Sequence, residues 1–402
     1  MTDQDFNIVC SKIDQEKEFL NSVSQDIWKM PEIMFKEFHA HAVLTSALEK
    51  KGFKIQKHYF MPTAFRAEFS SKLDGGPSVA ILLEYDALPE IGHACGHNLI
   101  AEAGLAASIA IKAVMEADPQ LVGKLIVLGT PAEEGGGGKI RLIELGAFEG
   151  IDIALIVHPT KVDVADPPTL CIVRATIDYK GKEAHASSYP WLGRNALDAA
   201  VACYNNLALL RQHIKPMCRI HAVITKGGVI PNVIPADTSL SLFVRAPTIG
   251  ELRELRTRVE TCITSAATAT GCEVIYNFSE QDAYENLKTN KVLGDLYQKF
   301  AERLGVNFIR DASLIPSTGS TDMGNLSHVI PSIHPFYSIC TEATNHTREF
   351  TEASGAPEAQ EPTLKAAKAM AMTALAVLRS QETLDEVKRQ FFADVRHDLQ
   401  FQ

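Results

Sequence analysis

The sequence predicts an α/β fold, in which a mainly parallel sheet forms one domain and a smaller α+β unit is inserted into it. Two observations support this prediction. The first third of the chain alternates short, continuous apolar runs with helical segments, a pattern typical of strands buried on both faces of a parallel sheet. From Cys171 to Phe278 the order changes to strand, helix, strand, strand, helix, strand, which is the ferredoxin-like arrangement.

The first third contains three predicted strands, at residues 78–83, 124–128 and 151–157. Each strand is followed by ionisable residues, which are, in chain order, Asp86, the pair Glu133 and Glu134, and His158. Because the carboxyl ends of parallel strands meet at one edge of a sheet, and ligands bind there, we expect these side chains to lie close together.

The remaining elements follow the same two patterns. In the first third, helices are predicted at 98–117 and at 139–145, the second closed by Gly146. The inserted unit has predicted strands at 171–179, 219–225, 238–245 and 272–278, and helices at 195–213 and 249–267. After it come predicted helices at 289–304 and 361–379, a strand at 332–339, and a charged surface helix at 383–402.

The elements after the inserted unit are too few to form a third domain, so we expect them to rejoin the first. The predicted division is a discontinuous α/β domain, residues 1–168 and 282–402, around an inserted domain, residues 169–281.

Composition excludes several classes of protein. Acidic residues outnumber basic ones, 49 to 39, and the net charge of −10 argues against a nucleic-acid or membrane-surface partner. The eight cysteines include no C-x-x-C pair, which favours reduced thiols. The first residues lack the pattern of a signal peptide, and no apolar run reaches the ~20 residues of a membrane helix. We therefore expect a cytoplasmic protein.

The segment from Gly92 to Asn98 holds the densest chemical signal. Cys95 and His97 lie two residues apart in a glycine-containing turn before a helix, so both can face one ion. The helix N-terminus and a cation would each lower the pKa of the thiol. The alternative from the residues alone is a buried free cysteine beside a helix-capping Asn98.

Glu133 and Glu134 are the second signal. Adjacent carboxylates repel each other unless a cation or a shared proton intervenes. One of the two glutamates would then bind a metal ion, and the other would take a proton from metal-activated water. The alternative is a solvated loop followed by a flexible tract, Gly135 to Gly138.

Two further histidines complete the candidate site. His158 ends a strand and His346 lies in a polar loop; taken singly, each could equally be a structural residue. Together with Cys95, His97 and the glutamate pair they supply more ligands than one tetrahedral ion needs. The set fits two ions that share ligands, whereas a closed structural zinc site would not need Glu133.

Four ordered motifs resemble the amidohydrolase branch of the M20 metallopeptidases. They are EYDALP at 84–89, HACGHN at 93–98, PAEEG at 131–135 and GSTDMGN at 319–325. The resemblance implies a catalytic domain of the zinc-peptidase type, with a phosphorylase/hydrolase-like fold. It also implies that the inserted ferredoxin-like unit is the family's lid and dimerisation domain.

The resemblance also implies roles for single residues. The implied metal ligands are Cys95, His97, Glu134, His158 and His346. Glu133 would be the general base and then the proton donor to the leaving amine. Asp86 would contact the ligand side chains rather than the metal ions.

In the inserted unit, the resemblance assigns His185 to the oxyanion in the partner subunit's site, and Asn232 and Arg245 to the substrate's carboxylate. A guanidinium fork suits a carboxylate. From the residues alone, His185 could be a solvated loop residue, Asn232 could shape a turn, and Arg245 could pair with a surface acid.

The resemblance implies two divalent ions per chain. Cys95 stands where the wider family has a bridging aspartate, and a thiolate changes metal preference. Zinc is expected, with manganese, nickel and cobalt as alternatives.

The implied activity is hydrolysis of an amide bond whose amine side is an amino acid with a free carboxylate. The favoured substrates are β-alanyl or γ-aminobutyryl dipeptides that end in lysine, ornithine or arginine. An N-acyl-amino-acid or aminobenzoyl-glutamate amidohydrolase is the alternative within the same class. A non-catalytic binding protein on the same fold is the alternative from another class. A homodimer is expected if His185 acts on a partner's site.

Overall fold

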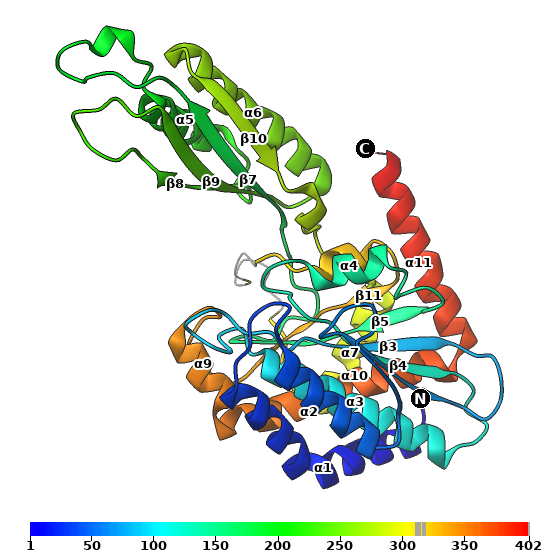
Figure 1. Cartoon of the computed structure of the whole chain (residues 1–402). Helices are drawn as coiled ribbons and strands as arrows, with labels where there is room; N and C mark the ends of the chain where they lie inside the picture. The colour runs from blue at the N-terminus through cyan, green and yellow to red at the C-terminus, as the bar shows by residue number, and fades with distance from the viewer. Residues whose placement is uncertain (310–314, 316–318, 401–402) are drawn as a thin grey trace. The chain divides into compact units, whose positions relative to one another are not determined.

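The computed structural model describes residues 1–309, 315 and 319–400 (Figure 1). Its described residues form two compact units. The first unit comprises 1–167, 287–309 and 322–400, and the second comprises 168–286 with 319–321. The second unit extends beyond the predicted end at residue 281, because Tyr284 exchanges two backbone hydrogen bonds of 2.9 and 3.0 Å with Ile172. Gly319 joins it by accepting a hydrogen bond from Leu170 at 3.0 Å.

The first unit is built on a six-stranded sheet with the order β1-β2-β4-β3-β5-β11. Its strands are β1 (Lys54–Lys57), β2 (Phe65–Ser70), β3 (Ser78–Leu83), β4 (Lys124–Gly129), β5 (Ile153–Leu155) and β11 (Ser332–Ile333). The pairs β4–β3, β3–β5 and β5–β11 are parallel, whereas β1 and β2 form an antiparallel edge. The prediction of a mainly parallel sheet is confirmed.

Two predicted strands differ in the structure. The segment predicted at 151–157 contains only β5, and β6 (His158–Thr160) begins directly after it, whereas the segment at 332–339 divides into β11 and β12 (Phe336–Ser338). β6 and β12 pair with each other in parallel as a separate two-stranded sheet. His158 therefore begins a strand rather than following one.

Helices cover both faces of the six-stranded sheet. They are α1 (Asp3–Lys29), α2 (Phe38–Lys50), α3 (His97–Ala117), α4 (Gly138–Glu144), α7 (Lys291–Arg303), α8 (Met323–Ser327), α9 (Arg348–Gly355), α10 (Gln360–Arg379) and α11 (Gln381–Gln400). Alternate residues of β3 face opposite layers, as strand geometry requires. Ile81 packs in the cluster that contains α3 and α10, and Leu82 packs in the cluster that contains α4 and α8.

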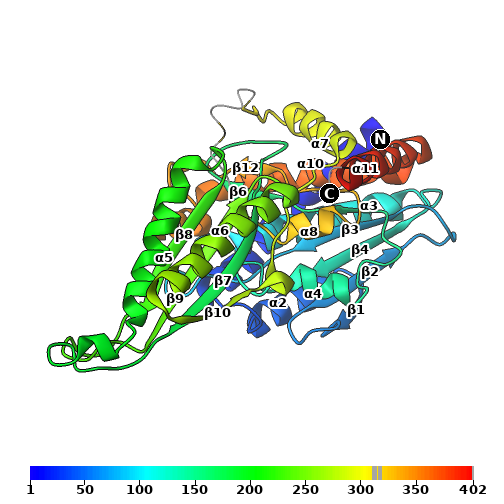
Figure 2. The ribbon, with the colours of Figure 1, turned by 90° about the horizontal axis from the view of Figure 1, so that it is seen from above.

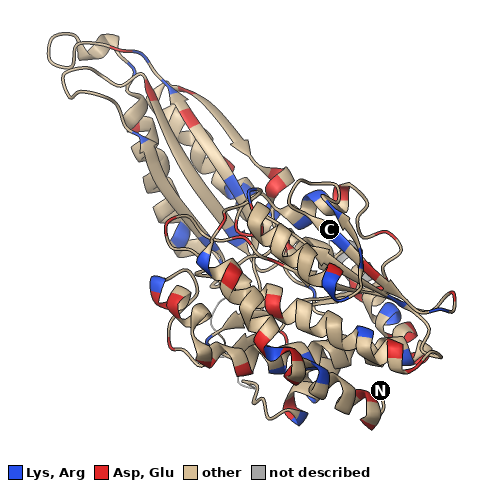
Figure 3. Ribbon diagram, turned by 60° about the horizontal axis from the view of Figure 1, so that its bottom comes forward, with Lys and Arg blue, Asp and Glu red and all other residues tan. Residues whose placement is uncertain are grey.

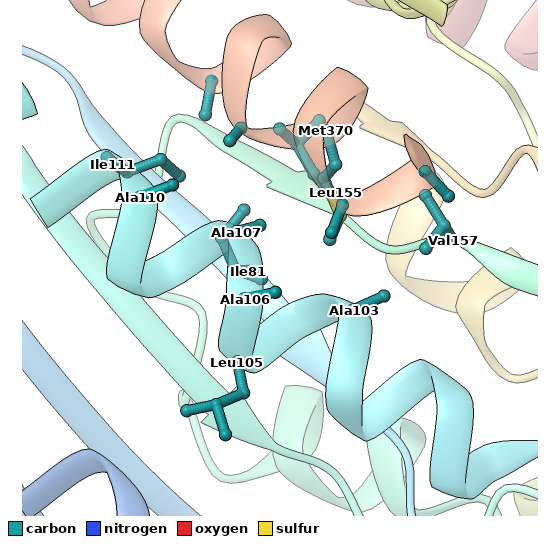
Figure 4. Packing of buried hydrophobic residues seen from close by; sticks show 14 of the residues in the cluster. Ile81, Ala103, Leu105, Ala106, Ala107, Ala110, Ile111, Leu155, Val157 and Met370 are labelled. Atoms are coloured by element: carbon teal, nitrogen blue, oxygen red, sulfur yellow. The ribbon is translucent and has the colours of Figure 1, made fainter. Parts of the chain in front are cut away.

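Small side chains bring α3 close to the sheet. Figure 4 shows Ala103, Ala106 and Ala107 of α3 near Met370 of α10 and the strand residue Leu155. A methyl group at Gly104 would lie 2.7 Å from Leu83 Cδ1, so only glycine fits that contact. α3 is long and apolar enough to cross a membrane by length and composition alone, which was not expected from the sequence, but most of it is buried within the first unit.

Acidic and basic residues are interspersed over the helices of the first unit (Figure 3). Glu16 of α1, for example, accepts hydrogen bonds from Lys12 at 2.8 Å and from Lys51 at 2.6 Å.

The second unit is a four-stranded antiparallel sheet with two helices. Its elements are β7 (Cys171–Lys180), α5 (Ala196–Leu210), β8 (Arg219–Lys226), β9 (Asp237–Ala246), α6 (Ile249–Thr270) and β10 (Glu273–Phe278). The strand order β10-β7-β9-β8 matches the ferredoxin-like arrangement predicted for it. Alternate residues of β9 are buried, and α5 and α6 lie side by side on that face (Figure 2).

Candidate metal centre

The ionisable residues that follow β3 and β4 come together with His158 in the first unit. β3 and β4 are parallel neighbours, so the segments after them leave the sheet at the same edge. Asp86 is 1% exposed and Glu133 is 7% exposed, although both carry carboxyl groups. Carboxyl groups that are buried this close together require hydrogen-bond partners or a cation.

Cys95, His97 and His158 form one group of potential ligands. Their donor atoms all lie within 4.8 Å of one another, and Cys95 Sγ is 3.4 Å from His158 Nε2. The turn that brings them together depends on Gly96, whose φ of 74° is left-handed. A Cβ at Gly96 would also lie 2.6 Å from the ring of Pro159. Glycine is therefore favoured there both by the backbone conformation and by the close contact.

Asp86 orients His97 toward this group. Its Oδ1 lies 3.0 Å from His97 Nδ1, which leaves His97 Nε2 buried and without a hydrogen-bond partner among the described residues. Burial alone would lower the pKa of His97, but the neighbouring Asp86 carboxylate raises it well above its ordinary value. A carboxylate that is hydrogen-bonded to one ring nitrogen commonly fixes the orientation of a metal-binding histidine. The other ring nitrogen is then free to bind the metal.

Cys95, Glu134 and His346 form a second group whose donor atoms also lie within 4.8 Å of one another. Glu134 Oε1 is 3.2 Å from His346 Nε2, and the backbone N–H of Glu134 donates to Asp86 Oδ2 at 3.0 Å. The backbone N–H of His346 donates to Ala94 at 2.8 Å, which holds the histidine beside the cysteine turn. The thiol of Cys95 belongs to both groups and is therefore placed to serve two ions.

Glu133 lies beside these groups without being part of either. Its Oε2 is 3.9 Å from His97 Nε2. Burial, together with the charges of Glu84, Glu134 and Asp322, raises the pKa of Glu133 well above its ordinary value. A carboxyl group whose pKa is raised binds a proton more readily than an ordinary one, which is a common property of general acid–base residues.

A buried ion cluster next to Glu133 was not predicted from the sequence. Lys139 Nζ lies 2.5 Å from Glu84 Oε1 and 2.6 Å from Asp322 Oδ1, and all three side chains are inaccessible to solvent. One available signal was that a lysine stands in the first turn of α4, where the helix dipole disfavours positive charge.

His334 is a second residue near the site that was not predicted from the sequence. It is buried, its ring lies 5.4 Å from that of His158, and both its nitrogens lack a hydrogen-bond partner among the described residues. No motif marks it in the sequence, because it lies between Pro331 and Pro335 within the segment predicted as a strand at 332–339.

The remaining predicted residues, His185, Asn232 and Arg245, belong to the second unit and are described within it. His185 Nδ1 accepts hydrogen bonds from the backbone of Ser187 and Ser188 at 3.3 and 3.2 Å. The carbonyl of Asn232 accepts from Ala186 at 3.1 Å, so the two predicted loops lie side by side.

Arg245 ends β9. Its Nη1 donates to Ser320 Oγ at 3.1 Å, while its Nε is buried without a partner among the described residues. Burial and the charge of Arg174 lower the pKa of Arg245. A buried guanidinium with an unused N–H is suited to an anionic group.

The two ligand groups fit divalent metal ions. The buried atoms His97 Nε2 and Glu84 Oε2 lack hydrogen-bond partners within the described part of the chain. Each such atom costs on the order of 1–3 kcal/mol unless a partner satisfies it. Thiolate, imidazole and carboxylate donors in one buried cluster are the ligands that zinc and neighbouring transition metals prefer.

The comparison with known families matches this site. The model of peptidase family M20/M25/M40 matches residues 81–376, which is most of the chain. The chain belongs to this peptidase family. It is accordingly a hydrolase that acts on amide bonds, and the matched segment includes each residue discussed for the two ligand groups.

Within the M20 family, the chain is similar to proteins named Xaa-Arg dipeptidase. It is 47% identical over 391 residues to the mouse protein and 46% identical over 393 residues to the human protein. Both alignments cover 94% of this chain and 90% of the relative. It is also 34% identical over 295 residues to a p-aminobenzoyl-glutamate hydrolase polypeptide of Escherichia coli, covering 68% of this chain and 60% of that protein.

Solved structures agree on the fold. A putative aminohydrolase from Staphylococcus aureus matches with a TM-score of 0.75 and 18% identity, covering 92% of this chain and 99% of that one. A dinuclear metal binding peptidase of the M20 family from Bacillus subtilis matches with a TM-score of 0.68 and 18% identity, covering 91% and 99%. At this identity the likeness concerns the fold, which confirms the predicted fold class.

Proposed function

We propose that this M20-family hydrolase cleaves dipeptides with a basic C-terminal residue, namely β-alanyl or γ-aminobutyryl groups joined to lysine, ornithine or arginine. The observation that carries the proposal is the buried cluster in which Cys95 joins two ligand groups beside Glu133. The 46–47% identity to proteins named Xaa-Arg dipeptidase, over 94% of the chain, supports the basic residue.

The proposed site holds two divalent ions, of which zinc suits the donor set best. The proposed ligands are Cys95, His97, Glu134, His158 and His346. When bound, such ions lower the pKa of a water molecule and polarise the carbonyl of the amide. The residues of the chain hold these ions, exclude bulk water and move the protons.

Glu133 carries the proton in this proposal. As a carboxylate it accepts a proton from the attacking water, and the hydroxide oxygen then bonds to the amide carbon. Glu133 next delivers the same proton to the amide nitrogen, the C–N bond breaks, and the amine and the carboxylic acid leave. The position of Glu133 beside both ligand groups, with Oε2 3.9 Å from His97 Nε2, suits both halves of this cycle.

The second unit is proposed to recognise the substrate. Arg245 carries an unused buried N–H and Asn232 offers a side-chain amide, and both can bind the free carboxylate of the C-terminal residue. We propose a homodimer in which His185 stabilises the oxyanion in the partner's site. We also propose a cytoplasmic location, which the eight free cysteines support.

A panel of substrates tests the proposed function. Purified protein loaded with zinc, manganese, nickel or cobalt should hydrolyse β-alanyl-lysine and β-alanyl-arginine. Turnover of N-acetyl amino acids and p-aminobenzoyl-glutamate should be at least ~100-fold slower in kcat/KM, the size of a difference of about 3 kcal/mol. Faster turnover of p-aminobenzoyl-glutamate would favour the alternative function, hydrolysis of that compound, for which the Escherichia coli relative is named. Specific binding of dipeptides without turnover under every metal would favour a non-catalytic binding protein.

A further inference from the structure

Glu37 is a buried carboxylate in the turn before α2, and neither the motifs nor the proposed mechanism uses it. We propose that Glu37 is a positioning residue for Glu133, because its side chain holds the backbone immediately before Glu133 in the conformation that the site needs. The inference rests on the proposed function in one respect, since it takes Glu133 as the group that moves the proton.

Two hydrogen bonds define the contact. Glu37 Oε1 accepts the backbone N–H of Ala132 at 2.9 Å and the backbone N–H of Phe35 at 2.8 Å. Glu37 is 0% exposed, so water does not compete for either bond. Burial and the charge of Asp86 raise the pKa of Glu37 to about 7, and Oε1 can accept both N–H groups in either charge state.

Both donors have backbone conformations that need support. Ala132 has a φ of 59° and Phe35 a φ of 58°, and neither is a glycine. For an L-residue the left-handed region is unfavourable, because Cβ lies too close to the following carbonyl oxygen. The single oxygen of Glu37 therefore stabilises two strained residues at once, one of which is directly bonded to Glu133.

The backbone on the other side of Glu133 is held in the same way. The N–H of Glu134 donates to Asp86 Oδ2 at 3.0 Å. Glu133 thus lies between two peptide groups that separate carboxylates, Glu37 and Asp86, fix from different segments of the chain. The direction in which the Glu133 side chain leaves the backbone follows from these two anchors.

The turn that carries Glu37 also packs on the glycines after the glutamate pair. A Cβ at Gly135 would lie 2.9 Å from Met34 Sδ, and a Cβ at Gly136 would lie 2.4 Å from Phe35 Cε2. The glycines leave room for these two side chains. The turn therefore contacts the loop both before and after Glu133.

The same turn is anchored to the segment that carries Asp86. The N–H of Ala87 donates to the carbonyl of Glu32 at 2.8 Å, and Ile33 forms a parallel bridge with Ala87. Both carboxylate anchors of the Glu133 loop are consequently parts of one rigid assembly.

Substitutions at Glu37 test the inference. Glu37→Gln keeps an oxygen that can accept both N–H groups, and we expect kcat within about 3-fold of wild type. Glu37→Ala removes the acceptor, and we expect kcat to fall about 10- to 100-fold with KM changed less than about 3-fold, as for a misplaced catalytic group. Glu102→Gln and Glu102→Ala are matched controls, because Glu102 is also 0% exposed but bonds to Gln360, outside the site.

A second substitution separates positioning from general loss of stability. Glycine adopts the left-handed region without strain, so the loop before Glu133 should depend less on the hydrogen bond to Glu37 in the Ala132→Gly variant. We expect the loss of kcat caused by Glu37→Ala to be at least about 5-fold smaller in the Ala132→Gly background. An equal loss in both backgrounds, or a Glu37→Ala loss no larger than that of Glu102→Ala, would overturn the inference.

Crystal structures keep the test independent of the substrate. In Glu37→Ala we expect Ala132 to leave the left-handed region and the Glu133 side chain to move, whereas Glu37→Gln should retain both. If the wild-type protein shows no turnover with any amide, the proposed function fails, and these structures still decide the role of Glu37. An unchanged Ala132 and Glu133 in Glu37→Ala would refute it.

Discussion

Three charged side chains of the first unit are buried together, out of contact with water. Glu84, Asp322 and Lys139 are fully buried, and the lysine lies within 2.6 Å of an oxygen of each acid. Burial lowers the pKa of a lysine, but here Asp322 and Glu84 raise the pKa of Lys139, so it stays charged. Burial raises the pKa of Glu133, and the negative charges of Glu84 and Asp322 in this cluster raise it further.

Removing this lysine should be costly. Lys139→Met leaves two buried carboxylates without their cation, so we expect the free energy of unfolding to fall by about 3–5 kcal/mol. Urea denaturation followed by circular dichroism measures it. Lys291→Met is the matched control, because Lys291 pairs with Asp295 at 2.8 Å on an exposed helix surface and should cost less than ~1 kcal/mol. Equal losses in the two variants would contradict the role of the buried cluster.

The role of Glu133 has its own prediction. Glu133→Gln keeps the size and polarity of the side chain but cannot carry the proton, so kcat should fall on the order of 10²- to 10⁴-fold. KM and the number of bound metal ions, measured by elemental analysis, should remain near the wild-type values. Glu144→Gln, on the exposed surface of α4, serves as the control. Full activity in Glu133→Gln would remove Glu133 from the mechanism.

Among the elements, α3 links the core to the site. Its N-terminal turn carries Cys95 and His97, and its body packs between the sheet and α10. The apolar character of this segment was sufficient to predict it, and the observed His97–Ala117 differs from the predicted 98–117 by one residue. β3 was predicted with its observed limits. Long apolar elements are the easiest to predict, because burial on all sides leaves no polar face.

Other elements were not predicted. α1 carries a capping box between Thr2 and Asp5, and buried residues such as Val9, Ile13 and Leu20 recur at helical spacing, so its pattern was present but weak against many polar residues. β1 and β2 are short, and β1 is largely exposed, so their pattern does not distinguish a strand from a loop. Their antiparallel pairing at the edge of the sheet is a tertiary feature.

The contact between α3 and the sheet can be tested at Gly104. Gly104→Ala places a Cβ 2.7 Å from Leu83 Cδ1, so overpacking should lower the free energy of unfolding by about 1–3 kcal/mol. The gain in helix propensity, at most ~1 kcal/mol, opposes this loss. Gly250→Ala, where the new Cβ would have nothing within 4 Å, should instead leave stability unchanged or raise it. Stabilisation by Gly104→Ala would show that the helix can move away from the sheet.

At the scale of the whole molecule, the candidate ligands come from segments far apart in the chain. Cys95 lies in the turn before α3 and His97 begins that helix, Glu134 follows β4, His158 begins β6, and His346 lies beyond the inserted unit. Ions that bind all of these segments connect both parts of the discontinuous first unit. Binding to the folded state alone stabilises it by about 3–4 kcal/mol at 100–1,000 times the dissociation constant.

Removal of metal should therefore destabilise the protein. We expect a chelator to lower the melting temperature by several degrees and to abolish hydrolysis, and a slight excess of zinc to restore both. The Cys95→Ser variant should show a smaller shift with the same chelator, because its thiol belongs to both ligand groups. An unchanged melting temperature after complete removal of metal would contradict a shared site.

The sequence by itself determined the parallel sheet and the ferredoxin-like unit, because apolar runs and their order along the chain are local properties. The residues of the candidate metal centre came from four motifs together with the family that they resemble, since no local pattern marks a loop residue such as His346. The tertiary structure alone revealed the cluster of Lys139 with Glu84 and Asp322, and the contact of Glu37 with Ala132. The atoms joined in these contacts lie 55 to 183 residues apart, and no local pattern encodes which buried charges meet once the chain has folded.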